Sequence, residues 1–486
     1  MAPPTYDLIV VGSGFAGCMT TLNFLETCKK LNKRGHVAML EVGRKGERCG
    51  ASRWTGAFLR MDKDLRFDED WIKEMMRVSK GQADAEYCQK LAMEAQETAE
   101  YVQAHGVHLI RHKEDNVFLE FKTDQHFVFP EGGGLAIVNA LLKHIDQYPN
   151  CDIHWETEAR HLLTSPKGAI TGVQVRKSDG LLYDLYAPDV MLACDGFEGN
   201  REMLAKYVGP KTHELPLIAP GLRYNKGAGL NMALEVGADS AGSFDGIHAE
   251  LVDTRATKPD AVIWGHNYGI LLNENCERFY DEGNRPLFAT FEMAAFYLWR
   301  DHHNRGYFVT DSTIMDRFRP GWVYESTDQE PVRADSIRDL ALKLGADPEK
   351  LAKTVSEFNA ACDPQRPFDL TKLDGKATTG LNPNKTNWAN PIDKPPYYAF
   401  PVAANLTFTY GGVKVNLDSQ VLGTNGVPIP GLYAAGELAG LYINEYPPAT
   451  SVLRSLTFGR LAGTAIAEKL QHPALRSAVS MGKSLL

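Results

Sequence analysis

A glycine-rich turn directly follows a short apolar run near the start of the chain. Residues 6–11 read YDLIVV, a nearly continuous apolar run typical of a strand that is buried on both faces. Residues 12–17 read GSGFAG, and apolar residues then recur at helical spacing over 18–31. A second apolar run, 36–40, ends at Glu41. Strand, glycine turn, helix, strand and acid in this order predict a βαβ unit of a parallel α/β sheet.

Each part of this unit has a physical role in binding a dinucleotide. Gly12 allows a tight turn, Gly14 lets the backbone approach a pyrophosphate, and Gly17 lets the helix pack closely on the strand. The N-terminus of the helix favours the negative charge of the diphosphate. Glu41 stands where an acid accepts hydrogen bonds from the adenosine ribose. The unit therefore predicts a dinucleotide cofactor, without distinguishing FAD from NAD.

Three later segments are rich in small residues. Residues 50–57 read GASRWTGA, as expected where backbone passes close to a flat ligand. Residues 188–193 form another buried-strand run, which leads into CDGFEGN at 194–200. Near the C-terminus, 431–437 read GLYAAGE, a strand that ends in a glycine and an acid, and a helix is predicted over 455–470.

Together these segments resemble the flavoprotein family of fumarate reductase and succinate dehydrogenase, over nearly the whole chain. The matching features, in chain order, are the glycine turn with Glu41, DGFEGN at 195–200, GGVKV at 411–415, GLYAAGE at 431–437 and TFGRLAG at 457–463. The resemblance implies that the cofactor is FAD. Some relatives attach FAD through a histidine just before the small-residue segment. Residues 48–52 read RCGAS, so we expect non-covalent FAD.

The resemblance also implies an α/β fold: a Rossmann-like FAD-binding domain of the glutathione-reductase type with an inserted α+β capping domain. Helix–strand alternation gives way to mixed segments after about residue 240, so we expect a discontinuous FAD-binding domain over 1–239 and 400–486 and a capping domain over 240–399. Residues 67–106 have helical periodicity. Residues 364–396, rich in Asn, Lys and Pro, predict a surface loop.

The family pattern assigns FAD contacts to specific positions of this chain. By resemblance, Glu437 lies near the ribityl chain, and the helix that follows points its N-terminus at the isoalloxazine, where it stabilises negative charge on the reduced flavin. The expected cofactor-binding residues are Gly12, Gly14, Phe15, Ala16, Gly17, Glu41, Val42, Gly50, Ser52, Thr55, Gly56, Ala159, Ala193, Cys194, Asp195, Gly436, Glu437, Ser451 and Val452.

Two residues of the expected capping domain are candidates for binding the substrate. Residues 271–285, LLNENCERFYDEGNR, look like the family's N-x-x-G-x-R-F-x-x-E motif followed by an arginine, here Arg285, one residue short of the usual spacing. Arg285 is a candidate carboxylate clamp or proton donor; the alternative is an ion-paired surface arginine. His248 lies close to the family's substrate-binding histidine, and the alternative is a core histidine. Arg278 is expected to pair with Asp281 or Glu282.

The chain also departs from the fumarate reductases. Phe408 replaces the histidine that precedes their Thr-x-Gly-Gly segment, and Val262 and Gly265 occupy the positions of their Glu-x-x-Arg proton relay. Residues 444–450, NEYPPAT, replace their C-terminal arginine segment. These differences argue against fumarate reductase or succinate dehydrogenase activity.

The Tyr-Pro pair in that last segment resembles two other branches of the family, tricarballylate dehydrogenase-like proteins and ketosteroid dehydrogenases. By analogy with the latter, the Tyr446 hydroxyl and the Thr450 amide would face a substrate carbonyl. Tyr410 is a candidate pocket residue. For both tyrosines, simple packing is the alternative.

Three functions remain open at this point. The leading one is an FAD-dependent dehydrogenase or reductase of an activated CH–CH bond in a small di- or tricarboxylate, similar to tricarballylate dehydrogenase. The alternative keeps this chemistry and changes the substrate to a ketone, steroid-like or related to secondary metabolites. The third is a flavin electron carrier without its own turnover. The direction, the electron partner and the oligomeric state stay open.

Composition excludes other classes of protein. The formal charge is −9 and the pI is about 5.9, which argues against a general nucleic-acid binder. The family resemblance implies a small-molecule substrate. The eight cysteines form no Cys-x-x-Cys pair, so no metal site is expected. No run is long enough to span a membrane, and a cytoplasmic location is expected.

Overall fold

The computed structural model describes residues 5–48, 50–68, 70–111, 127–194, 196–286, 289–317 and 327–470. Its main sheet has six strands in the order β17-β18-β9-β1-β2-β5. They are β1 (Leu8–Val11), β2 (Val37–Leu40), β5 (Cys151–His154), β9 (Asp189–Leu192), β17 (Gln420–Leu422) and β18 (Pro428–Ala434).

The middle of this sheet is parallel, as the sequence predicts. β1 pairs with β2 on one side and β9 on the other, and all four residues of each of these strands are buried. β18 extends the parallel part beside β9, and β17 closes that edge as an antiparallel strand. The predicted βαβ unit is therefore confirmed. β1 lies inside the sheet, between β9 and β2, and both of its faces are covered, as its continuous apolar run predicts.

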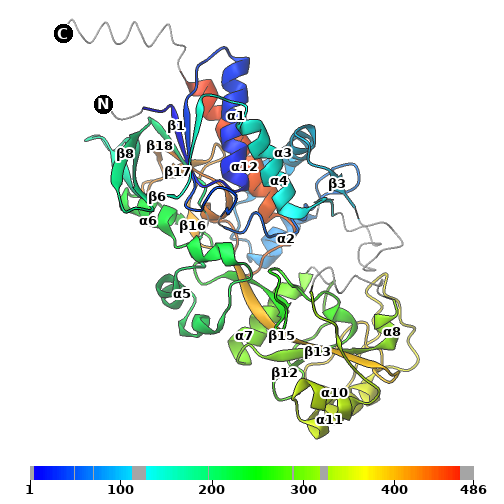
Figure 1. The fold of residues 1–486 in the computed structure, drawn as a ribbon. Coiled ribbons are helices and arrows are strands. Elements are labelled where there is room, and N and C mark those ends of the chain that lie inside the picture. Colours follow the sequence, from blue (N-terminus) through cyan, green and yellow to red (C-terminus); the bar gives the residue numbers. More distant parts are fainter. Residues whose placement is uncertain are drawn as a thin grey trace, which may run out of the picture.

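Helices cover one face of the main sheet (Figure 1). They are α1 (Phe15–Lys30), α2 (Trp71–Val78), α3 (Ala85–Ala104), α4 (Gly133–Ile145) and α12 (Ser451–Lys469). α1 and α12 begin before the predicted residues 18 and 455, because the glycine turn and the 444–450 segment lead straight into helix.

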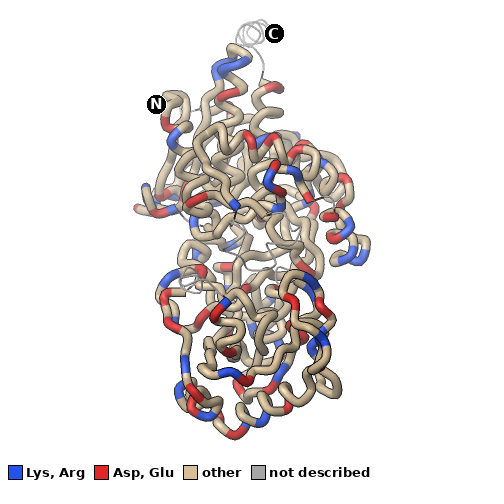
Figure 2. The backbone as a smooth tube through the Cα atoms, turned by 90° about the vertical axis from the view of Figure 1, so that its right-hand side faces the viewer, with Lys and Arg blue, Asp and Glu red and all other residues tan. Residues whose placement is uncertain are grey.

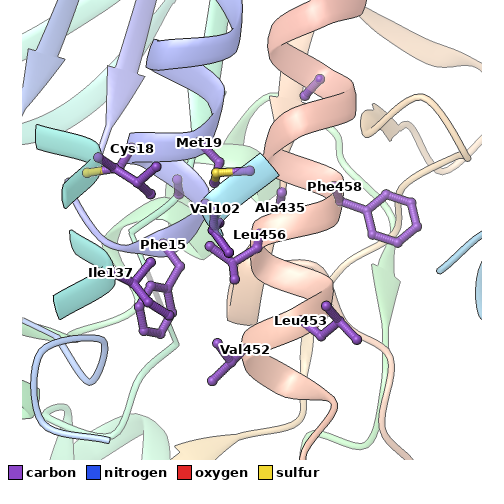
Figure 3. Close-up of a cluster of buried hydrophobic side chains, with 14 of the residues drawn as sticks. Phe15, Cys18, Met19, Val102, Ile137, Ala435, Val452, Leu453, Leu456 and Phe458 are labelled. Atoms are coloured by element: carbon purple, nitrogen blue, oxygen red, sulfur yellow. The ribbon is translucent and has the colours of Figure 1, made fainter. Parts of the chain in front are cut away.

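α1 and α12 pack closely, which joins the N-terminal and C-terminal ends of the described chain. A Cβ atom on Gly459 would lie 2.6 Å from the carbonyl oxygen of Ala16, so only glycine permits this approach. Apolar side chains of both helices fill the contact, among them Phe15, Met19 and Leu456 (Figure 3). The glycine turn and the start of α12 are thereby held on one side of the sheet.

A second sheet lies apart from the main one and holds the residues around 250–400 (Figure 1). Its strands β11 (Ile247–Asp253), β15 (Tyr397–Thr409), β13 (Gly306–Asp311) and β12 (Ile270–Asn273) are antiparallel, and β14 (Val332–Ala334) also pairs with β15. The helices around it are α7 (Phe291–Asp301), α8 (Ser312–Met315), α10 (Ile337–Leu344) and α11 (Pro348–Ala361).

The long strand β15 runs from the second sheet back towards the main one. The predicted boundary between residues 399 and 400 falls inside this strand. The domain limits therefore stay a prediction. Acidic and basic residues are interspersed over both parts of the molecule, as Figure 2 shows. The remaining described elements are β3 (Leu109–Ile110), β4 (Phe129–Pro130), β6 (Thr157–Thr164), β7 (Ile170–Lys177), β8 (Leu182–Tyr186), β10 (Ser240–Ala241), β16 (Gly412–Val413), α5 (Arg201–Tyr207) and α6 (Ala228–Glu235).

The 364–396 segment has neither helix nor ladder strand, as predicted, but it does not lie wholly on the surface. Trp388 is 2% exposed, and Lys385 is fully buried. The Lys385 amine donates to the carbonyl oxygens of Asn267 at 2.6 Å and Gly269 at 2.5 Å. Burial lowers the pKa of Lys385 to about 8. The expectation of a surface loop is wrong for these residues. Polar composition suggested exposure to solvent, but the polar amine of Lys385 is satisfied by hydrogen bonds inside the protein.

Candidate active site

The glycine turn has the geometry that its sequence predicts. Gly12 has a φ of +106°, and a Cβ atom there would overlap the carbonyl oxygen of Ala193 at the end of β9. A Cβ atom on Gly17 would overlap the carbonyl oxygen of Gly12. A Cβ atom on Gly14 would lie 2.8 Å from the Ser52 hydroxyl. The segments that follow β1, β2 and β9 thus meet where no side chain fits.

Polar groups surround this turn. The Phe15 amide, at the N-terminus of α1, donates to the Ser52 hydroxyl at 3.2 Å. Glu41 is 4% exposed and accepts hydrogen bonds from the Ser13 hydroxyl at 2.5 Å and the Gly43 amide at 2.7 Å. Arg48, which the sequence analysis passed over, donates to the Ser13 carbonyl at 2.7 Å. A buried guanidinium therefore stands beside the turn.

The C-terminal residues of the predicted cofactor site lie on the same side. A Cβ atom on Gly436 would be 3.3 Å from that of Ala16. The partly buried Glu437 carboxylate accepts hydrogen bonds from the Thr409 amide at 2.9 Å and the Thr409 hydroxyl at 3.0 Å. Burial raises the pKa of Glu437. A Cβ atom on Gly196 would overlap this carboxylate, so Gly196 also lies directly against Glu437.

The other predicted cofactor residues take these places. Thr55 and Gly56 adjoin the start of α4, where the Gly134 amide donates to the Thr55 carbonyl at 2.8 Å. The Gly50 amide donates to the Gly221 carbonyl at 3.2 Å. Asp195 lies outside the described residues. Of the rest, Val42 follows Glu41 after β2, Ala159 is buried in β6, Cys194 follows β9, and Ser451 and Val452 begin α12.

A second cluster centres on His248, which lies on β11 and is 2% exposed. Its Nδ1 is 2.6 Å from Oε2 of Glu292 on α7, and its Nε2 is 3.2 Å from Oε1 of Glu250. Burial by itself lowers the pKa of His248, but hydrogen bonds to the two glutamates and their charges outweigh it and raise the pKa to about 9. His248 is therefore a buried imidazolium held between two carboxylates.

The same cluster includes both predicted tyrosines. Tyr410 donates its hydroxyl proton to Oε1 of Glu292 at 2.5 Å, and the Tyr446 amide donates to the same oxygen at 3.0 Å. The Tyr446 hydroxyl accepts the amide protons of Thr450 and Ser451 at 3.0 and 3.1 Å. The predicted pair of Tyr446 hydroxyl and Thr450 amide is therefore brought together, with the two groups bonded to each other.

Aromatic rings enclose this network. Phe408 lies with its ring centroid 4.9 Å from that of His248 and 5.0 Å from that of Tyr446. Tyr442 stands 4.9 Å from Tyr446 and 5.7 Å from Tyr410. The residue that replaces the family's histidine is thus part of an aromatic wall.

Arg285 is placed near this cluster but is already paired. It donates to Oε2 of Glu445 at 2.9 Å, and its other terminal nitrogen is 3.7 Å from Glu74. Arg77 bonds Glu74 at 2.6 Å and lies 3.8 Å from Glu445, which closes a ring of four alternating charges. Arg278 pairs with Glu282 at 2.6 Å, as expected from the sequence.

Sequence analysis missed the glutamates of this site. Glu292 is 44 residues from His248 and belongs to no motif, so only the fold brings them together. Glu250 is two residues from His248 on the same strand, and strand alternation could have placed both side chains on one face. Glu445 precedes Tyr446 directly, a position that the Tyr-Pro analogy left unexamined.

The profile of the FAD binding domain family matches residues 7–451. The chain belongs to this family. The predictions of the α/β flavoprotein fold, of FAD as cofactor and of an oxidoreductase family are thereby confirmed. Non-covalent attachment stays a prediction.

The flavoprotein is similar to several curated reductases. It is 24% identical to vinyl phenol reductase of Lactiplantibacillus plantarum, over 91% of this chain and 92% of that protein. It is 26% identical to NADH:acrylate oxidoreductase of Vibrio harveyi over 68% of this chain, and to urocanate reductase of Eggerthella lenta over 69%. The chain covers 32% and 54% of those two proteins, which are longer.

Solved structures show the same fold. The flavoprotein aligns with the open conformation of a flavocytochrome c3 fumarate reductase with a TM-score of 0.74 and 22% identity, over 96% of this chain and 79% of that one. It aligns with 3-ketosteroid delta1-dehydrogenase from Sterolibacterium denitrificans with a TM-score of 0.72 and 18% identity, over 96% of this chain and all of that one.

The residues present fit FAD. The glycine turn leaves the first amides of α1 facing a cradle that any Cβ atom would fill, and Glu41 and Arg48 stand beside it. Within the described ranges, no helix has the length and apolarity to cross a membrane. The cytoplasmic location stays a prediction. The same residues include no cluster of three or more potential metal ligands.

Proposed function

We propose that this flavoprotein reduces, or in reverse forms, a carbon–carbon double bond in an uncharged substrate that carries an aromatic ring or a ketone. One observation carries the proposal: both candidate anion-binding residues are already ion-paired. Arg285 pairs with Glu445 at 2.9 Å, and His248 pairs with Glu292 and Glu250.

The charge balance disfavours a substrate with several carboxylates. The four carboxylates of Glu74, Glu250, Glu292 and Glu445 surround the three cations of Arg77, His248 and Arg285. A carboxylate that entered would have to displace one of these glutamates and leave its charge unpaired at a partly buried site, which is costly. The predicted di- or tricarboxylate therefore stays a prediction with little support from the geometry.

The aromatic wall supports a flat, apolar substrate. Phe408, Tyr442 and Tyr446 lie within ring-contact distance of one another beside His248. Rings of this kind bind planar groups by offset or edge-on contacts and exclude water. The similarity to vinyl phenol reductase over nearly the full length of both proteins supports an aromatic substrate in particular.

The roles of the protein residues follow from their positions. FAD, when bound, supplies or accepts the hydride at its N5 atom. The chain's own groups must then exchange a proton with the neighbouring carbon. The Tyr410 hydroxyl, bonded to Glu292, is the proton-bearing group that we assign to this step. The Tyr446 hydroxyl, polarised by two amides at the start of α12, orients a carbonyl or phenol oxygen.

Anaerobic flavin spectroscopy tests the proposal. The purified protein, with its flavin reduced by dithionite, is mixed with 4-vinylphenol, 4-androstene-3,17-dione, urocanate, acrylate or fumarate, and flavin absorbance is followed. We expect reoxidation by one of the first two compounds. The saturated partners, together with tricarballylate, are mixed with oxidised protein to test the reverse direction by bleaching.

Two results would contradict the proposal. Reoxidation of the flavin by fumarate or acrylate, with no response to the uncharged compounds, would show that the substrate is a carboxylate. A flavin that responds to no compound in either direction, and is reduced only by a partner protein, would support an electron carrier instead.

A further inference from the structure

The hydrogen bonds around His248 form one continuous series across the junction of the two sheets. The series starts at the Tyr410 hydroxyl, passes through both oxygens of Glu292, crosses the His248 ring from Nδ1 to Nε2 and ends at Glu250. Its three links measure 2.5, 2.6 and 3.2 Å, all within hydrogen-bond range. Every member can both gain and lose a proton.

Exposure changes along this series. Tyr410 is fully buried, and the side chains of Glu292 and His248 are 6% and 3% exposed. The Glu250 side chain is 13% exposed, which makes it the outermost member. Asp260 interacts electrostatically with both Glu250 and His248.

We infer that Glu250, His248 and Glu292 form a proton path that links the outer side of β11 to the Tyr410 hydroxyl at the junction of the two sheets. The inference rests on the proposed function, because a proton must reach or leave the substrate carbon. It uses residues different from the relay that the family's reductases carry at the positions of Val262 and Gly265.

The proton balance closes in the direction of reduction. The O–H bond of Tyr410 breaks as its proton forms the new C–H bond on the carbon next to the one that receives hydride. Glu292 returns a proton to Tyr410 and takes the Nδ1 proton of His248. His248 is then neutral and keeps its proton on Nε2, so its ring must turn over to present the unprotonated nitrogen to Glu250. Glu250 delivers a proton to that nitrogen and takes one from water. One proton moves from water to the substrate, and dehydrogenation runs the same steps in reverse.

Burial explains why such a path needs both glutamates. Burial and the charge of Glu292 hold the pKa of Tyr410 well above its usual value, so Tyr410 is a poor acid while Glu292 is ionised. Transfer of the His248 proton to Glu292 neutralises both groups and removes that charge. Glu250 keeps His248 protonated beforehand. The groups facing His248 are Glu250 on its own strand, Glu292 on α7, Tyr446 before α12 and the nearby Asp260.

Glu250→Gln tests the path, since it keeps the shape and removes the outer carboxylate. With reduced holoenzyme and 4-vinylphenol, we expect flavin reoxidation to slow by about 10²-fold, the usual scale of acid–base catalysis. The pH at which the rate falls off should also move lower, because His248 loses a group that raises its pKa. The matched control is Glu274→Gln, at a partly exposed glutamate just after β12, which should behave as the wild type.

A second variant addresses a folding defect. His248→Ala should be slow and should regain rate when imidazole is added, whereas a purely structural role would give no rescue. A wild-type rate and pH profile in Glu250→Gln, or a FAD-loaded His248→Ala that imidazole does not rescue, would overturn the path.

A readout without turnover separates this inference from the proposed function. Selective ¹⁵N-histidine NMR of the FAD-loaded protein at pH 8 should show His248 protonated on both nitrogens in the wild type and neutral in Glu250→Gln. A neutral wild-type His248 would overturn the path even if 4-vinylphenol is a substrate. If no compound reoxidises the wild-type flavin, the proposed function fails, whatever the state of His248.

Discussion

The Arg285 guanidinium donates to the Glu445 carboxylate at 2.9 Å, across the junction between the second sheet and the loop that leads into α12. Glu445 directly precedes Tyr446, so the ion pair ends one residue from the aromatic cluster. Both side chains are 27% exposed. An arginine that the sequence marks as a carboxylate clamp therefore has a carboxylate of the protein as its partner.

Glu445→Gln should make the site more receptive to carboxylates. The change frees Arg285 from its main partner and removes one negative charge, so we expect the Kd of fumarate or acrylate to fall by about tenfold, equivalent to about 1.4 kcal/mol. Stability should change by less than about 1 kcal/mol, because the pair is partly exposed. Flavin absorbance titration measures the Kd, and Glu445→Asp, which keeps the charge, is the control. An unchanged Kd would place Arg285 outside the substrate site.

Gly17→Ala should abolish FAD binding. The added methyl group would overlap the Gly12 carbonyl, which is fixed by the turn, so the β1–α1 connection must shift. Overpacking of this kind costs about 1–3 kcal/mol of stability. Flavin content after purification and Tm are the measurements.

Gly168→Ala is the matched control for that variant. Gly168 has a φ of +80° in the connection between β6 and β7, and nothing lies within 4 Å of its would-be Cβ. Backbone strain alone should cost about 1–2 kcal/mol, with full flavin content. Normal flavin content in Gly17→Ala would refute the assigned role of the turn.

The sequence predicted the βαβ unit at the centre of the main sheet, but not the edge strands β5 and β17. The apolar run before Gly12 and the acid after the second run both lie within one βαβ unit, where spacing determines the contacts. The closeness of Gly436 to Ala16 was accessible only through the family pattern, since those residues are far apart in the chain.

The chemistry around His248 was less accessible. His248 itself was found, but its partners Glu292 and Glu250 were not, and they change it from a hydrogen-bonding group for the substrate into an imidazolium between two carboxylates. A pairing between a strand and a distant helix has no periodic signature in one sequence. Buried Lys385 was missed for a related reason. It lies in a polar segment that resembles a surface loop, and its amine bonds two carbonyl oxygens more than 100 residues earlier in the chain.

Stability should fall as the pH rises above neutrality, in part through His248. Its pKa in the folded protein, about 9, lies above the ordinary value of 6.5, so its contribution is complete below about pH 6.5 and is lost as the pH rises through 9. The span corresponds to a contribution on the order of 3 kcal/mol. Urea unfolding at pH 6.5 and 9.5 should show a larger loss for the wild type than for His248→Gln. His213→Gln, at an exposed histidine, should follow the wild type; equal losses in all three proteins would refute the charged state of His248.

Tyr446→Phe should separate orientation of the substrate from proton transfer. The Tyr446 hydroxyl accepts the amide protons of Thr450 and Ser451, so its removal leaves two donors at the start of α12 without their acceptor. We expect a loss of about 1–3 kcal/mol in stability. The turnover rate with 4-androstene-3,17-dione should fall, while the pH at which the rate falls off should stay as in the wild type. The reason is that the hydroxyl, in the proposed function, orients an oxygen and lies outside the His248 series. Tyr433→Phe, whose hydroxyl lies near Lys469 at the far end of α12, is the control. A shift of the pH profile in Tyr446→Phe, with unchanged substrate affinity, would instead make Tyr446 the proton donor in place of Tyr410.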